Sequence, residues 1–340
     1  MTMEDRIILE THGLTKKYGP VTAVEELNLS VRQGEVFGLL GPNGAGKTTT
    51  TLMLLGLTEP TAGRALIQGF DCTRQPIQVK KLVGYLPDNV GFYGDLTGRE
   101  NLRFTGQLCG LPAALCEERA QQLLERVGMA QAAERKVSAY SRGMRQRLGI
   151  ADVLMKDPSV IIMDEPTLGL DPEGTRELIA LIRQLSTQDG RTILISSHQL
   201  YQVQRICDRV GIFVQGRLIA CGPIQELGRQ LENEGLYILE FAVSPADEAL
   251  EQRLQELEGV TLVQRDQEGA YHVESHQDLR GLLLPLLAQG GYTLLSLRQR
   301  GGDLDEIYRK YFEKAGEQGA HTEPQQKRGG LLGKFAKKQG

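Results

Sequence analysis

The sequence predicts an α/β domain over residues 1–228, a small α+β domain over 229–314 and a flexible basic tail over 315–340. Up to about residue 225, apolar strand-like runs alternate with helical patterns, which is typical of an α/β layer. The runs PSVIIMDEP and GRTILISSH are short, continuous and apolar, as in strands buried at the centre of a parallel sheet. After residue 236 the order of elements changes to one that suits an antiparallel sheet of ferredoxin-like type.

The first domain begins with two runs, ILETHGLTKKYG and VTAVEELNLSV, that indicate antiparallel strands. Between about residues 88 and 150 the patterns become helical. Thr97 and Glu100 form a capping box, Pro112 stands at a first helical position, and Gly128 marks a helix end. We therefore expect an antiparallel β subdomain and a helical subdomain within the α/β domain.

The run VGIFVQGRLIACG predicts a hairpin around Gln215 and Gly216 that closes the first domain. The second domain then reads as strand, helix, two strands, helix, strand and a last helix, DLDEIYRKYFEKA. Residues 315–330 contain few large apolar groups, so we expect a flexible linker there. The final stretch, GGLLGKFAKKQG, is either a solvated tail or a short basic segment that rests on an anionic membrane surface.

Three glycines follow an apolar strand and precede a helical pattern in GLLGPNGAGKTTT, residues 38–50. Such glycines let backbone N–H groups turn inward and form a nest for anions. The stretch from Gly41 to Thr48 fits G-x-x-x-x-G-K-[ST], a phosphate loop in which Lys47 reaches the β- and γ-phosphates and the Thr48 hydroxyl binds Mg²⁺. A glycine-rich turn without a ligand is the alternative, but the strand–loop–helix setting favours nucleotide. The predicted contacts are Asn43, Gly44, Ala45, Gly46, Lys47, Thr48 and Thr49.

Asp164 and Glu165 stand side by side at the end of the apolar run VIIMDEP. Two carboxylates at the end of a buried strand are costly unless a cation or hydrogen-bond donors lie nearby. We predict that Asp164 holds Mg²⁺ and that Glu165 acts as general base on the attacking water. The sequence therefore predicts an enzyme that hydrolyses a nucleotide.

Composition limits the other classes of function. The chain has 340 residues, of which 40% are hydrophobic and 24% charged, as in globular proteins. No apolar run approaches the roughly 18 residues of a membrane span, and the start MTMEDRIILE lacks a signal-peptide pattern, so we expect a cytoplasmic protein. Five scattered cysteines without a C-x-x-C pair argue against disulfides or zinc. The net charge is −4 although the last fourteen residues carry five Lys/Arg and no acid, and this acidic body argues against nucleic-acid binding.

The stretch YSRGMRQR, residues 140–147, lies between the phosphate loop and the carboxylate pair. Ser141 can cap the following helix, and Gly143 exposes backbone N–H near its start. In this position the stretch resembles the signature motif of ATP-binding cassette (ABC) ATPases, usually L-S-G-G-Q. Over residues 6–225 the chain matches further motifs of that family: Tyr18 in KKYG (the aromatic that stacks on adenine), Asp88 in GYLPD (the Q-loop), Asp171 in LGLD (the D-loop) and His198 in SSH (the switch histidine).

Two motifs depart from the usual pattern of the family. Asp88 stands where the Q-loop has Gln; a carboxylate there is still able to bind Mg²⁺, but it adds charge near the phosphates and is expected to alter coupling to the membrane partner. Arg142 and Met144 replace a glycine and the glutamine of the signature, while Ser141 and Gly143 remain, so we expect an active signature. These variants resemble the ATPases of ABC-2 type exporters, the drug-resistance branch.

The resemblance implies that two cassettes dimerise head to tail, with ATP and Mg²⁺ between one phosphate loop and the partner's Ser141 and Gly143. His198 then contacts the γ-phosphate, and closure of the dimer drives separate ABC-2 type membrane-spanning permease subunits at the cytoplasmic face of the membrane. We expect a homodimer, with a heterodimer as the alternative. The stretches ENLRFTGQL and EIYRKYFEKAG also resemble the ATPase of a transporter for nitrous oxide reductase (copper-site) maturation, and a soluble ABC ATPase without a transporter is the third reading. The cargo stays open.

Overall fold

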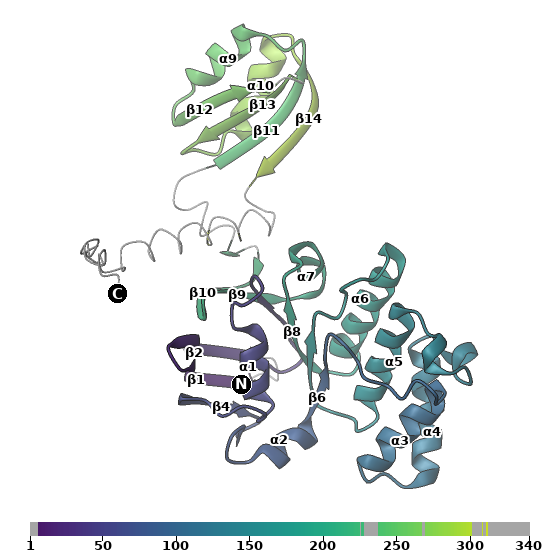
Figure 1. Ribbon diagram of the computed structural model, residues 1–340. Coiled ribbons are helices and arrows are strands. Elements are labelled where there is room, and N and C mark those ends of the chain that lie inside the picture. Colours follow the sequence, from purple (N-terminus) through teal and green to yellow (C-terminus); the bar gives the residue numbers. More distant parts are fainter. Residues whose placement is uncertain are drawn as a thin grey trace, which may run out of the picture.

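The computed structural model describes residues 6–224, 226, 227, 237–266, 269–300, 308 and 311. These residues form a larger first part with a six-stranded and a four-stranded sheet, and a second part with its own four-stranded sheet (Figure 1). Within these ranges, the structure contains no helix that is both long enough and apolar enough to cross a lipid bilayer.

The six-stranded sheet carries the candidate site. Its strands lie in the order β10, β9, β3, β8, β7, β6, and all neighbours are parallel except β10, which runs antiparallel to β9. Their bounds are β3 (Val36–Leu40), β6 (Val83–Leu86), β7 (Val160–Asp164), β8 (Thr192–Ser197), β9 (Arg209–Val214) and β10 (Arg217–Gly222). Every residue of β3, β7 and β8 is buried, so the prediction of central parallel strands is confirmed.

The other sheet of the first part is antiparallel, as the early strand patterns predicted, with the order β2, β1, β4, β5. Its bounds are β1 (Ile7–Tyr18), β2 (Val21–Arg32), β4 (Ala62–Ile67) and β5 (Phe70–Asp71). Helix α1 (Lys47–Leu54) joins the two sheets, because its Met53 and Leu54 belong to one apolar cluster with Leu9 of β1 and Phe37 of β3. Helix α2 (Pro76–Leu82) contributes Val79 to the same cluster.

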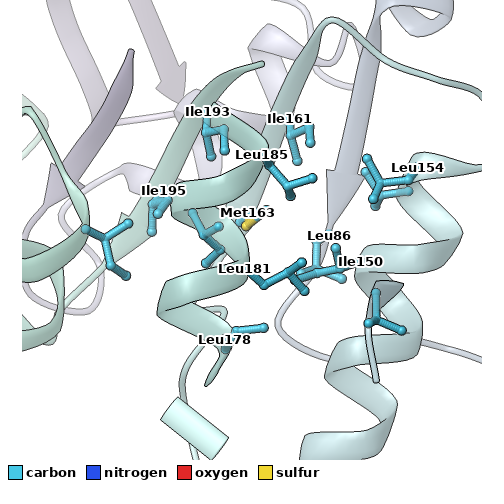
Figure 2. Packing of buried hydrophobic residues seen from close by; sticks show 14 of the residues in the cluster. Leu86, Ile150, Leu154, Ile161, Met163, Leu178, Leu181, Leu185, Ile193 and Ile195 are labelled. Atoms are coloured by element: carbon cyan, nitrogen blue, oxygen red, sulfur yellow. The ribbon is translucent and has the colours of Figure 1, made fainter. Parts of the chain in front are cut away.

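Helices α5 (Arg142–Leu154), α6 (Pro172–Thr187) and α7 (Leu200–Ile206) cover the opposite face of the six-stranded sheet. Helices α3 (Gly98–Leu108) and α4 (Ala113–Arg126) pack against α5. Figure 2 shows apolar side chains of α5 and α6, among them Ile150 and Leu181, packed with Leu86 of β6, Met163 of β7 and Ile195 of β8. This packing fixes where α5 and α6 begin relative to the ends of the strands.

Local signals set most of the boundaries in the helical subdomain. Helix α4 ends at Arg126, and Gly128 follows with φ +69°, which confirms the predicted helix end. Pro112 lies one residue earlier than predicted, at the N-cap of α4, because its carbonyl accepts the first helical hydrogen bond from the Cys116 N–H (2.9 Å). Gln215 and Gly216 both have positive φ, +48° and +84°, as the predicted two-residue hairpin between β9 and β10 requires.

The capping box of α3 is expected to stabilise the helical subdomain. Thr97 Oγ1 accepts from the Glu100 N–H (3.2 Å), and the Glu100 carboxylate accepts from the Thr97 N–H (2.7 Å). Thr97→Ala should lower the free energy of unfolding by about 1 kcal/mol, measured by chemical denaturation. Thr187→Ala is the control, because that hydroxyl donates only to the Arg183 carbonyl of its own helix (2.8 Å). Equal losses in the two variants would contradict the capping role.

The second part has the element order β-α-β-β-α-β and the strand order β12, β13, β11, β14, all antiparallel, which is the arrangement of a ferredoxin-like domain. Its elements are β11 (Tyr237–Ser244), α9 (Glu248–Gln255), β12 (Val260–Arg265), β13 (Ala270–Ser275), α10 (Arg280–Gln289) and β14 (Thr293–Arg300). Leu250 of α9 and Leu283 of α10 share one cluster with Phe241 of β11, so both helices cover the same face of the sheet (Figure 1).

The predicted last helix and the basic tail lie outside the described residues, apart from Tyr308 and Tyr311. Both tyrosines are helical, and both pack against the apolar cluster of the first part.

Candidate active site

The carboxyl ends of four neighbouring strands bring the predicted site residues together. The phosphate loop follows β3, Asp164 ends β7, His198 follows β8, and Asp88 lies two residues after β6. The strand register pairs Leu40 with Ser197 and Asp164 with Ser196, so these ends lie at one edge of the sheet. A cavity of about 290 Å³ opens there, lined by Ala23, Asn43, Gly44, Gly46, Lys47, Thr48, Thr49, Asp88, Asp164 and Glu165.

Close packing dictates two of the glycines in the phosphate loop. Gly46 has φ +106°, and a Cβ there would lie 2.2 Å from the Ala23 carbonyl oxygen of β2. A Cβ on Gly41 would lie 2.4 Å from the Phe213 carbonyl oxygen of β9. The loop is thus held between two strands, and α1 begins directly after it at Lys47. The N-terminus of this helix favours an anion in the cavity.

Lys47 is the buried cation of this cavity, with only 6% of its surface exposed. Its ammonium donates to the carbonyl oxygens of Gly41 (2.7 Å) and Pro42 (3.1 Å) within its own loop. Burial lowers the pKa of this ammonium, and the carboxylates of Glu165 and Asp164 act in the opposite direction. The amine of Lys47 lies in the same cavity as Thr48 and Thr49, where it can donate to phosphate oxygens.

A hydrogen bond inside the sheet orients Asp164. Its Oδ1 accepts from the Ser196 hydroxyl of β8 at 2.7 Å. Burial raises the pKa of Asp164, and the bond from Ser196 lowers it. The Asp164 side chain also lines the cavity, together with Lys47 and Thr48.

Three donors orient Glu165. Its Oε2 accepts from the Ser197 hydroxyl (3.0 Å), and its Oε1 accepts from the His198 backbone N–H (3.0 Å) and lies 2.6 Å from His198 Nδ1. The backbone of Glu165 has φ +47°, a left-handed conformation that costs a non-glycine residue free energy and is common at functional sites. This arrangement positions one carboxylate in the wall of the cavity, where it can accept a proton.

The donor set fits a magnesium ion that arrives with nucleotide. Within the described part of the chain, no three His, Cys, Asp or Glu side chains are grouped closely enough to hold a metal ion by themselves. Mg²⁺ is ordinarily bound by one or two carboxylates together with substrate phosphates and water. Asp164, Asp88 and the Thr48 hydroxyl line the same cavity as Lys47, and so offer oxygen ligands beside the place for phosphates.

Comparisons with known proteins give the family. A family model described as "ABC transporter" matches residues 24–168. The bacitracin transport ATP-binding protein BcrA of Bacillus licheniformis is 36% identical over 303 residues, which cover 89% of this chain and 96% of that protein. This chain belongs to the ATP-binding proteins of ABC transporters. The ABC ATPase is also 33% identical to the linearmycin resistance ATP-binding protein LnrL of Bacillus subtilis (strain 168), over 88% of this chain and 97% of LnrL.

Solved structures agree with this family. The structure of an ATP-binding subunit of an ABC transporter superposes with a TM-score of 0.61 and 32% sequence identity, covering 67% of this chain and 95% of that one. The ABC ATPase is thus an ATP-hydrolysing subunit that powers a transporter, and its fold contains the nucleotide-binding cassette that the family motifs together predicted.

Some residues predicted from the family motifs lie outside the cavity. Ser141 is the N-cap of α5 and accepts from the Met144 N–H (3.3 Å), while Asp171 is the N-cap of α6 and accepts from the Gly174 N–H (2.6 Å). Tyr18 is 49% exposed at the end of β1 and does not line the cavity. The small side chain of Ala45 is buried, and its carbonyl accepts from the Gly216 N–H (2.9 Å).

Sequence reasoning missed three residues of the site. Ser196 and Ser197 hold the two carboxylates, and Ala23 lines the cavity through β2. The serines directly precede His198, so the strand register of a parallel sheet could have placed them beside Asp164. The sequence does not indicate a role for Ala23, because its contact with the phosphate loop is made by a backbone carbonyl and not by its side chain.

Proposed function

We propose that this chain is the ATPase subunit of an ABC-2 type exporter, in which two cassettes bind Mg²⁺-ATP head to tail and drive separate membrane-spanning subunits from the cytoplasmic face. The observation that carries the proposal is Glu165, which is hydrogen-bonded to Ser197 and His198 and lines the same cavity as the phosphate loop. The names of the two relatives that match over almost their full length, for bacitracin transport and linearmycin resistance, support export and make antibiotics the first cargo to test.

In this mechanism each residue of the cavity has its own role. Lys47 and the backbone N–H groups of the phosphate loop bind the β- and γ-phosphates. Thr48 and Asp164 hold Mg²⁺, which neutralises charge on the transferred phosphoryl group when bound. Glu165 accepts a proton from the attacking water, and His198 orients its carboxylate and contacts the γ-phosphate. Asp88 lines the same cavity, where it would offer a third oxygen ligand to the metal.

The second cassette completes the site. Ser141 and Gly143 begin α5 outside the cavity of their own chain, which supports a role at the nucleotide of the partner cassette. Asp171, at the start of α6, contributes to the site only when the partner cassette is present. The exposed Tyr18 contributes when nucleotide is bound, by stacking on adenine. Residues 1–228 form the ATPase domain in this proposal, 229–314 an accessory domain, and 315–340 a basic tail.

The test is to identify the partner directly. The Glu165→Gln variant is purified from membranes of its host in mild detergent with ATP and Mg²⁺, and its partners are identified by mass spectrometry. We expect a polytopic membrane protein of ABC-2 type in an amount equal to that of the ATPase. Recovery of ribosomal or DNA-associated proteins without a membrane partner would contradict the transport function.

A further inference from the structure

Arg142 and Asp88, two of the residues that depart from the usual ABC motifs, contact each other. Arg142 Nη2 of the signature lies 3.1 Å from Asp88 Oδ1 of the Q-loop, although the two residues are 54 positions apart in sequence. The arginine also touches the D-loop, because a Cβ on Gly169 would lie 2.9 Å from Arg142 Nε and 3.0 Å from its Cζ. The guanidinium of Arg142 therefore lies between Asp88 and the loop at Gly169, at the start of α5.

Asp88 lies between two cavities. It lines the nucleotide cavity with Asp164 and Glu165, and it also lines a second cavity of about 410 Å³ with Arg142, Arg145 and others. Its negative charge acts on the nucleotide side, where it contributes to the raised pKa of Asp164. The Asp88 carboxylate thus pairs with the Arg142 guanidinium and also lines the nucleotide cavity, where Mg²⁺ would bind.

The ion pair between Arg142 and Asp88 is weak enough for another cation to replace Arg142 as the partner of Asp88. The Arg142 and Asp88 side chains are 51% and 47% exposed, and one nitrogen–oxygen contact joins them. A single exposed pair of this kind contributes little free energy, so a divalent ion bound with ATP can compete for the carboxylate. A buried bidentate pair would hold Asp88 too firmly for such competition.

We propose that Arg142 is a positioning residue that holds Asp88 on the signature helix and competes for it with the Mg²⁺ that enters with ATP. When Asp88 turns toward the nucleotide cavity, Arg142 loses its anion, and the start of α5 and the D-loop at Gly169 are no longer tied to the Q-loop. Binding in one cavity is thereby coupled to loops that face the partner cassette. This inference rests on the proposed function, because it requires a magnesium–nucleotide site.

The first test measures binding rather than turnover. A methylanthraniloyl-labelled, non-hydrolysable ATP analogue is titrated with Mg²⁺ against the full chain and its variants. In Arg142→Gln the competitor is removed, so we expect the Mg²⁺ concentration at half-saturation to fall about two- to fivefold, the scale of an exposed ion pair. Arg142→Lys keeps the charge and should remain close to the unsubstituted chain.

Arg145→Gln is the matched control. Arg145 lies on the same helix and lines the same second cavity, but it donates to the Ser138 carbonyl (3.4 Å) and not to Asp88. We expect its Mg²⁺ dependence to be unchanged. An equal shift in the two glutamine variants would overturn the inference, because a general loss of positive charge would then explain both.

A double-mutant cycle provides the second test. Asp88→Asn removes the contested carboxylate, so Arg142→Gln should have no further effect on the Mg²⁺ dependence in that background. Additive effects would overturn the inference while leaving the proposed function intact. If the unsubstituted chain bound the analogue without any dependence on Mg²⁺, the proposed function itself would fail, and the inference would fail with it.

Discussion

Replacing Glu165 with glutamine is expected to lower ATP turnover by about 10²- to 10⁴-fold while ATP binding is retained. Glutamine keeps the shape of the side chain, and its single amide oxygen can still accept from the His198 N–H, but it cannot take a proton from water. Steady-state phosphate release measures the turnover. Equilibrium binding of labelled ATP measures the affinity.

Glu173→Gln is the control for this prediction. Glu173 is an exposed carboxylate in the first turn of α6 that pairs with Arg176 (2.9 Å), and it does not line the nucleotide cavity. Its loss should leave turnover within about twofold of the unsubstituted chain, since exposed pairs contribute little. Turnover near the normal rate in Glu165→Gln would refute the assignment of the general base.

Replacing Lys47 with alanine is expected to weaken ATP binding by about a hundredfold or more. The ammonium provides charge-assisted hydrogen bonds to phosphate, each contributing about 1.5–3 kcal/mol, and 1.4 kcal/mol corresponds to a factor of ten in affinity. No other lysine or arginine lines this cavity among the residues that the structure describes. Equilibrium titration with labelled ATP measures the change.

Lys156→Ala is the matched control for Lys47. Burial also lowers the pKa of Lys156, whose ammonium likewise donates to a backbone carbonyl, that of Lys80 (2.9 Å), but it does not line the nucleotide cavity. Its substitution should affect the melting temperature without changing the affinity for ATP. If both variants lost affinity equally, the role of Lys47 would be structural and not one of phosphate binding.

Local patterns predicted the parts of the site that lie within one stretch of sequence. The apolar run before Asp164 and Glu165 identified a buried strand, and Gly41, Gly46 and Lys47 identified the phosphate loop, because each pattern reports the conformation of its own backbone. The same holds for Ser141, which caps α5 as predicted from the residue type and the following helix.

Contacts between distant strands and loops could not be predicted in the same way. The bond from Ser197 to Glu165 depends on the order and register of β7 and β8, and 32 residues separate the two side chains. The pair of Asp88 with Arg142 depends on how α5 packs on the sheet. The sequence marked both residues as unusual, but only the fold places one beside the other.

The packing around Gly41 and Gly46 has a consequence for the thermodynamics of ATP binding. A Cβ on either residue would overlap a backbone carbonyl of a neighbouring strand, so the phosphate loop packs closely against β2 and β9. A preorganised cradle loses little conformational entropy when the phosphates enter, and most of the interaction free energy then appears as affinity. We therefore expect the conformational changes of the ATPase cycle to take place in parts of the chain outside this loop.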